Sequence, residues 1–242
     1  MILLRSTLFF ILSIVNTIFW GIFTVPASIL HARTGYDLAR SWGICELWMI
    51  QHICGIRHRI NGLENIPSHP CISMAKHQSA WETVFILCHI PRAVWIIKKE
   101  LVWLPIIGWV LAGLKSIAID RKSGKAAIEQ IVEQGRDRLA EGWWISIFPE
   151  GTRVAPKTRG NYRIGGAILA ARTGASVLPI AHNAGEVWPR YSFLKYPGTV
   201  TVCIGPVIAS QGREPAAIMA DVETWIEGEM ERMSPARGMG TA

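Results

Sequence analysis

The sequence predicts an α/β domain, with a mostly parallel central sheet flanked by helices, preceded by an N-terminal membrane-anchoring helical segment. Short apolar runs of strand length alternate along the chain with segments of helical periodicity, as in a largely parallel sheet. Ahead of these runs, residues 6–30 form a stretch of 25 residues without a charge. A helix of that length, rising about 1.5 Å per residue, can cross the ~30 Å hydrocarbon core of a bilayer.

The uncharged stretch is expected to be an uncleaved membrane anchor. Arg5 precedes it, and His31 and Arg33 follow it. A cleaved signal peptide is the alternative, but the apolar region of such a peptide usually spans only about 7–15 residues.

Residues 36–56 are less apolar, because Asp37, Arg40 and Glu46 interrupt them, so this stretch should not cross a membrane alone. Its apolar residues recur at helical spacing, which fits either an amphipathic helix at the membrane interface or a helix facing the core. The expected organisation is a membrane-anchoring helical hairpin at 1–56, an α/β domain at 57–234 and a disordered tail at 235–242.

Each element of the α/β domain follows from the residue pattern. Apolar runs bounded by turn residues predict strands, and apolar residues at helical spacing predict helices. The expected strands are 59–63, 70–74, 94–97, 116–119, 144–148, 177–181 and 199–204. The expected helices are 80–88, 125–141, 165–173 and 221–233.

Composition favours a lipid or anionic partner over nucleic acid. Half of the residues are hydrophobic and 18% are charged, against about 25% in average soluble domains. The net charge of +7 accompanies 11 Trp, a residue that prefers membrane interfaces. No nucleic-acid-binding motif or long basic run is present. The 5 cysteines include no CxxC pair, so we expect free thiols in a reducing compartment and no metal site.

A histidine with a carboxylate five residues later lies at a predicted strand-to-helix turn, in the segment Lys76-His77-Gln78-Ser79-Ala80-Trp81-Glu82. Imidazole can accept a proton from an alcohol near neutral pH, and a carboxylate can hold the ring in the useful tautomer. No GxSxG or HExxH motif is present, so His77 would activate an incoming hydroxyl. The alternative is structural, because Ser79 and Glu82 also have the spacing of a capping box.

Three further motifs lie after or within predicted strands. In the first, Phe148-Pro149-Glu150-Gly151-Thr152-Arg153, glycine lets the backbone approach a ligand and arginine can grip phosphate oxygens. The second, Ile119-Asp120-Arg121, places another arginine at a strand end. The third, Val177-Leu178-Pro179-Ile180, lies within a predicted strand instead of after one, and a proline there predicts an edge or bulge near a site. An ordinary turn with solvated basic residues is the structural alternative for the first two motifs.

The order HxxxxE, IDR, FPEGTR and VLPI resembles the glycerolipid acyltransferase family, and most closely its bacterial members that acylate 1-acylglycerol-3-phosphate. The resemblance covers about residues 59–208. It implies that His77 is the catalytic general base and that Glu82 takes the place of an aspartate that partners the histidine. It also implies which residues bind the acceptor phosphate and which support the acyl donor or site architecture: Arg121, Glu150, Gly151, Thr152 and Arg153 for the phosphate, and Pro179 for the donor.

The sequence departs from the family pattern at two places. HxxxxE replaces the usual HxxxxD, which makes the acidic side chain one methylene longer. Lys115 and Ala118 replace a glycine and a phenylalanine of the usual GxxFIDR block, so the resemblance specifies the reaction more closely than the acceptor. Glycerol-3-phosphate, a lyso-aminolipid, or an inactive lipid-binding module remain alternatives.

The expected partners are membrane lipids, lysophosphatidic acid, and acyl-CoA or acyl-carrier protein as the donor substrate, with no cofactor, no metal and no nucleic acid. The expected location is the bacterial inner membrane, with the catalytic domain on the cytoplasmic side. Residues 92–125 interleave seven Lys/Arg with Trp95, Trp103 and Trp109. This stretch is read either as a membrane-contacting surface or as a buried helix flanked by solvated lysines.

Overall fold

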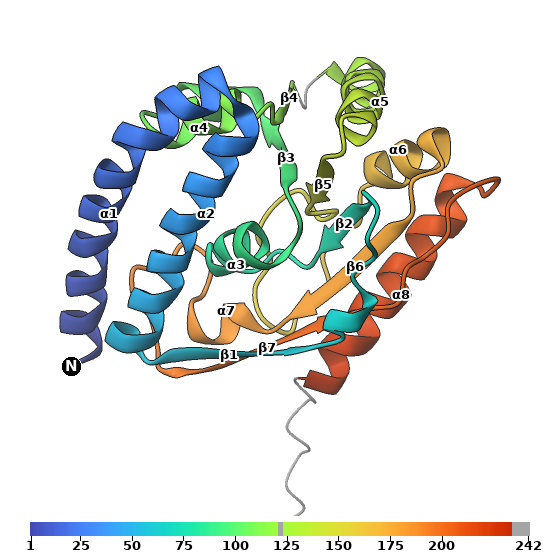
Figure 1. Cartoon of the computed structure of the whole chain (residues 1–242). Coiled ribbons are helices and arrows are strands. Elements are labelled where there is room, and N and C mark those ends of the chain that lie inside the picture. The colour runs from blue at the N-terminus through green and yellow to red at the C-terminus, as the bar shows by residue number, and fades with distance from the viewer. Residues whose placement is uncertain (121–122, 234–242) are drawn as a thin grey trace, which may run out of the picture.

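The computed structural model describes residues 1–120 and 123–233 and confirms the predicted fold class. Seven strands of the described chain form one sheet in the order β1-β7-β6-β2-β5-β3-β4 (Figure 1). All neighbouring strands are parallel except β6 and β7. The strands are β1 Ile56–Asn61, β2 Ile72–Ala75, β3 Ala93–Lys98, β4 Ile117–Ile119, β5 Trp144–Ile147, β6 Val177–His182 and β7 Gly198–Ile204.

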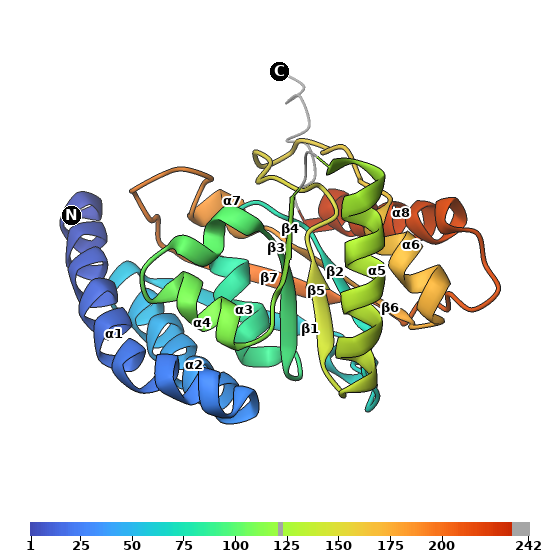
Figure 2. The same ribbon diagram turned by 90° about the horizontal axis from the view of Figure 1, so that it is seen from above.

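Helices cover both faces of the sheet. On one face lie α5, α6 and α8, and on the other lie α3 and the α1–α2 pair (Figure 2). The central strands β2 and β6 are buried along their whole length, as a covered parallel sheet requires. The helices are α1 Ile2–Leu30, α2 Ala32–Met49, α3 Trp81–His89, α4 Ile107–Gly113, α5 Lys125–Ala140, α6 Gly165–Thr173, α7 Ala184–Val187 and α8 Pro215–Met233; a π-helical turn spans Ile50–Cys54, and 3-10 turns span Leu63–Asn65 and Lys99–Trp103.

Some boundaries differ from the sequence-based expectation. Helix α8 begins at Pro215 instead of 221, because proline is favoured at the first helical position, where its missing N–H costs nothing. Strand β1 begins at Ile56, since its pairing with β7 extends to Gly198. The short helix α7 was not expected, whereas α4 lies within the basic and aromatic stretch 92–125, for which a buried helix was one of the two readings.

The two N-terminal helices pack against each other and against the α/β domain. They approach closely, since a Cβ on Gly35 of α2 would lie 2.4 Å from the Ser28 Cα of α1. Glu46 is buried between them, where it accepts hydrogen bonds from Ser13 (3.0 Å) and Asn16 (3.0 Å) of α1. This partnership explains how a charged residue is tolerated in the hairpin.

Helix α1 presents its remaining surface outward. In the described chain, one helix, α1, is long and apolar enough to cross a membrane. Many of its large apolar side chains are exposed, including Leu4, Phe10, Ile18 and Phe19. Trp103 and Trp109, next to or on α4, are exposed as well, whereas Trp95 is buried. The helices α1 and α4 therefore carry an apolar outer surface.

Candidate active site

His77 lies at the carboxyl end of the central strand β2, just before α3 begins. Parallel strands bring their carboxyl ends, and the loops that follow, to one edge of the sheet, where sites are commonly built. The His77 Nδ1 is 2.8 Å from the Glu82 Oε1, so the structure brings the two predicted catalytic residues together. The His77 ring stacks on Phe148, with the ring centroids 4.0 Å apart and an interplanar angle of 9°.

Glu82 serves both roles that the sequence left open. Its carboxylate is buried and accepts the backbone N–H groups of Gln78 (2.9 Å) and Ser79 (2.8 Å) as well as the His77 ring. Burial by itself raises the pKa of Glu82, but His182, the His77 hydrogen bond and the Ser79 N–H outweigh it, so the net pKa is lowered. Glu82 is therefore ionised at neutral pH, and it both caps the turn and orients the histidine.

An ionised Glu82 determines the tautomer of His77. A carboxylate can only accept, so Nδ1 carries the hydrogen and Nε2 keeps its lone pair. The nearby His182 is different: it is buried, its Nε2 donates to the Lys76 carbonyl at 2.8 Å, and burial lowers its pKa. Of these two histidines, His77 is the one that offers a free basic nitrogen to a cavity.

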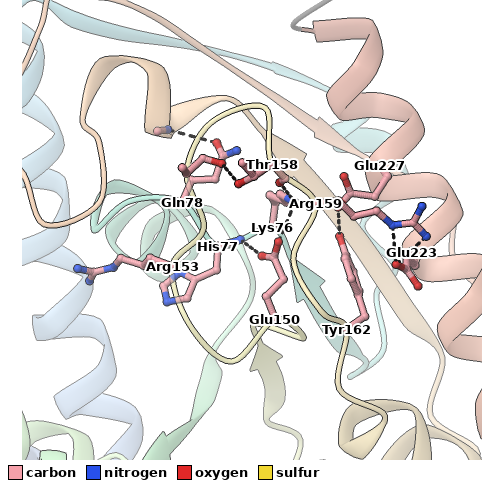
Figure 3. A network of polar contacts seen from close by, with 12 residues as sticks. Lys76, His77, Gln78, Glu150, Arg153, Thr158, Arg159, Tyr162, Glu223 and Glu227 are labelled. Atoms are coloured by element: carbon pink, nitrogen blue, oxygen red, sulfur yellow. Dashed lines mark hydrogen bonds and ion pairs between the residues drawn. The ribbon is translucent and has the colours of Figure 1, made fainter.

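Glu150 contacts the backbone of His77 and is not exposed to solvent. Its Oε2 accepts the His77 backbone N–H at 2.7 Å, and its Oε1 lies 2.7 Å from the Lys76 ammonium (Figure 3). Burial raises the pKa of Glu150, and the Lys76 ammonium opposes that effect. The side chain has no exposed surface. The geometry gives no support to phosphate binding by Glu150, because the carboxylate is enclosed and would repel an anion.

The rest of the FPEGTR motif forms a loop that crosses the His77 backbone. Gly151 has φ +69°, a left-handed conformation that favours glycine. Thr152 is exposed, and the Val154 N–H donates to the His77 carbonyl at 2.8 Å. Arg153 is half-buried, and its guanidinium points away from the Lys76–Glu150 pair (Figure 3). It lines the same cavity as His77.

Two predicted site residues have different outcomes. Arg121 lies outside the described residues. Pro179 is buried in β6, which is an interior strand of the sheet, so the prediction of an edge position was wrong. The proline is tolerated there because the β6–β7 ladder begins at Ile180, while Val177 pairs separately with Ile208, so no donor is needed between them. Its carbonyl accepts the Gly205 N–H at 2.9 Å, which makes Pro179 part of the architecture of this irregular pairing.

An apolar cavity of about 360 Å³ extends from His77 and Arg153 between the N-terminal helices and the sheet. Segments far apart in the sequence form its walls: α1, α2, α3, β3, α4 and Phe148. Sequence patterns could not show this cavity, since its apolar wall residues resemble ordinary core residues. Its apolar lining includes Trp20, Trp42, Leu87, Ile97, Leu104 and Val110.

Comparison with known proteins identifies the family of the chain. The acyltransferase family model matches residues 57–183. The chain is 40% identical to the 1-acyl-sn-glycerol-3-phosphate acyltransferase of Pseudomonas aeruginosa, over 96% of this chain and 92% of that protein. It is 26% identical to the mouse 1-acyl-sn-glycerol-3-phosphate acyltransferase alpha, over 84% of this chain and 72% of that protein.

A solved structure shares the fold. The 1-acyl-sn-glycerophosphate (LPA) acyltransferase PlsC from Thermotoga maritima matches with a TM-score of 0.80 and covers 97% of both chains at 22% identity. The predicted resemblance is thus confirmed by the family model, the sequence relatives and the fold. The family match spans more than half of the chain and includes both the histidine and the FPEGTR motifs, so this chain belongs to the acyltransferase family and is an O-acyltransferase.

Proposed function

We propose that this enzyme transfers a fatty acyl chain from an acyl thioester, either acyl-CoA or acyl-carrier protein, to the sn-2 hydroxyl of 1-acylglycerol-3-phosphate, giving phosphatidic acid. The observation that carries the proposal is the His77–Glu82 pair, which opens onto an apolar cavity with an arginine beside it. The names of the relatives from Pseudomonas aeruginosa and mouse support the acceptor.

In this proposal His77 acts as the general base. Its Nε2 takes the proton of the acceptor hydroxyl while that oxygen forms a bond to the thioester carbonyl carbon. The tetrahedral intermediate then collapses, the C–S bond breaks, and the leaving thiolate takes the proton from the imidazolium. Glu82 stabilises the positive ring during this cycle, and such base catalysis typically contributes about 10²–10⁴-fold.

The acceptor phosphate is assigned to Arg153, together with Arg121 and the Gly151–Thr152 segment. Arginine binds phosphate oxygens bidentately. In the described chain, Arg153 lines the cavity that His77 also lines, so one ligand can reach both side chains. Glu150 is better assigned to holding the His77 backbone.

The apolar cavity is assigned to the acyl chain of the donor. Burying methylene groups contributes about 0.8 kcal/mol each, so a long chain gains binding free energy in a cavity with these walls. Because α1 and α2 supply part of the wall, the cavity lies against the helices with exposed apolar surface. A lipid substrate can then reach His77 from the membrane, for which we propose the cytoplasmic face of the bacterial inner membrane.

The test is product analysis of purified protein given a panel of lysolipids and both thioester donors. Phosphatidic acid formed from 1-acylglycerol-3-phosphate by the wild type, and not by His77→Ala, is the expected result. Preferred transfer to glycerol-3-phosphate or a lyso-aminolipid would overturn the acceptor assignment. No transfer to any acceptor would favour an inactive lipid-binding module.

A further inference from the structure

A buried lysine connects the catalytic turn to the C-terminal helix. Lys76 directly precedes His77 and is 1% exposed. Its ammonium lies 2.7 Å from Glu150 Oε1 and 2.7 Å from Glu227 Oε1, and it donates to the Thr158 carbonyl at 3.3 Å (Figure 3). A buried ammonium is tolerated only when it is paired and hydrogen-bonded, and Lys76 has two hydrogen bonds, to Glu227 and Thr158, and an ion pair with Glu150.

Glu227 lies on α8, beyond the region that the family model matches. It also accepts the Tyr162 hydroxyl at 2.7 Å, and Tyr162 belongs to the loop that follows the FPEGTR motif. Lys76 lies 5.9 Å from the centre of the Tyr162 ring. The helix and the loop therefore meet at one buried cation.

Both sides of this network lead to the reacting groups. On one side, Lys76 pairs with Glu150, and Glu150 accepts the His77 N–H at 2.7 Å. On the other, Lys76 and Glu227 hold the loop at Thr158 and Tyr162, and the same loop donates from Val154 to the His77 carbonyl. Arg153 directly precedes Val154 in the sequence. The hydrogen bond from Val154 therefore connects the Arg153 loop to the backbone of His77, the residue that Arg153 faces.

We propose that Lys76, Glu227 and Tyr162 form a positioning network through which α8 fixes His77 and the Arg153 loop relative to each other. None of the three lines the cavity, so they act through Glu150 and the loop and not on the substrate. Removing the Glu227 charge leaves Lys76 with one carboxylate and weakens the buried contact between the loop and α8, while the exposed Arg159–Glu223 pair remains. This inference concerns acyl transfer at the site of the proposed function, and it holds for whichever acceptor the wild type uses.

The test compares Glu227→Gln with Glu223→Gln in the full-length, membrane-bound protein. Glu223 is the matched control, because it lies one turn earlier on α8 and pairs with the exposed Arg159 at 2.8 Å. Initial rates are measured as thiol release, with the acceptor that the wild type prefers. We expect Glu227→Gln to lower kcat at least tenfold with the donor KM within twofold, because the network does not touch the acyl cavity. Glu223→Gln should change neither.

Tyr162→Phe is the second variant, since it removes one hydroxyl and leaves all charges in place. We expect a smaller loss of kcat, about threefold, again with an unchanged donor KM. A folded Glu227→Gln enzyme with wild-type kcat would overturn the proposal. If Glu227→Gln does not fold, Tyr162→Phe decides: a lowered kcat supports the network, and wild-type kcat overturns it. A wild type that prefers another acceptor refutes the proposed acceptor but leaves this comparison intact.

Discussion

Replacing Glu82 by glutamine separates the charge of this side chain from its shape. In the structure, Oε1 accepts three hydrogen bonds, from His77 and from the backbone of Gln78 and Ser79. A glutamine carbonyl oxygen can occupy that position and keep Nδ1 of His77 protonated. The tautomer is thus preserved, and the change removes the negative charge opposite the ring.

The expected magnitudes follow from these contacts. The new amide NH₂ would face the Ser79 N–H, which donates to Oε2 at 3.0 Å, and two facing donors in a buried site cost about 1–3 kcal/mol of stability. For turnover, a hydrogen bond to a charged group contributes about 1.5–3 kcal/mol. At about 1.4 kcal/mol per factor of ten, kcat should fall about 10- to 150-fold.

The assay measures thiol release at saturating donor together with thermal unfolding by circular dichroism. Glu82→Asp restores a carboxylate on a shorter side chain and is expected to lie between the wild type and Glu82→Gln in kcat. A Glu82→Gln enzyme with wild-type kcat would refute the orienting role and leave Glu82 as a cap of the turn. A wild-type melting temperature for Glu82→Gln would show that the two facing N–H donors, of Ser79 and of the new amide, rearrange without loss of stability.

The other predictions address the base, the phosphate site, the anchor and pH. His77→Ala should lose about 10²–10⁴-fold in turnover while still sedimenting with membranes, and turnover within tenfold of wild type would exclude the general base. Arg153→Ala should raise the KM for a phosphate-bearing acceptor much more than it lowers kcat, and Arg121→Ala should behave alike; unchanged acceptor KM in both would remove phosphate recognition from them. Deleting residues 1–33 should release the protein from membranes or make it aggregate, and should abolish activity because Trp20 and Thr24 leave the cavity wall; a monodisperse, active truncation would contradict this. The pKa of Glu82 is lowered in the folded protein, so the ionised carboxylate stabilises the fold above the unfolded pKa of about 4.3, and this stabilisation is lost as pH falls through the lower folded pKa. The difference in unfolding free energy between wild type and Glu82→Gln should therefore shrink below about pH 4. A difference that does not change with pH would contradict this prediction.

The local patterns of the sequence were enough to predict most elements and the contact between His77 and Glu82. Strand and helix signals depend on neighbouring residues, so α6 coincides with the expected helix at 165–173 and β6 differs by one residue. His77 and Glu82 are five residues apart in one turn, so their spacing already implied contact. The FPEGTR motif likewise lies within one loop, and its family assignment needed no tertiary structure.

Contacts between distant segments were decided only by the tertiary structure. Glu150 looks like a site residue in sequence, but its ion pair with Lys76 places it behind the histidine, enclosed from solvent. Pro179 suggested an edge or a bulge, because the missing donor can be read from the sequence, whereas the irregular β6–β7 pairing that accommodates the proline in an interior strand depends on distant residues.

The apolar cavity and the link to α8 show the same limit most clearly. Lys76 and Glu227 are 151 residues apart, and nothing near either residue marks its partner. The cavity walls come from α1 to α4 and β3, whose apolar residues are indistinguishable in sequence from those that only fill the core. The sequence determined which chemical groups are present and which neighbours they have along the chain. The packing of the elements determined which groups are buried, which are paired and which face a cavity, because those properties depend on atoms that the chain brings together only after it has folded.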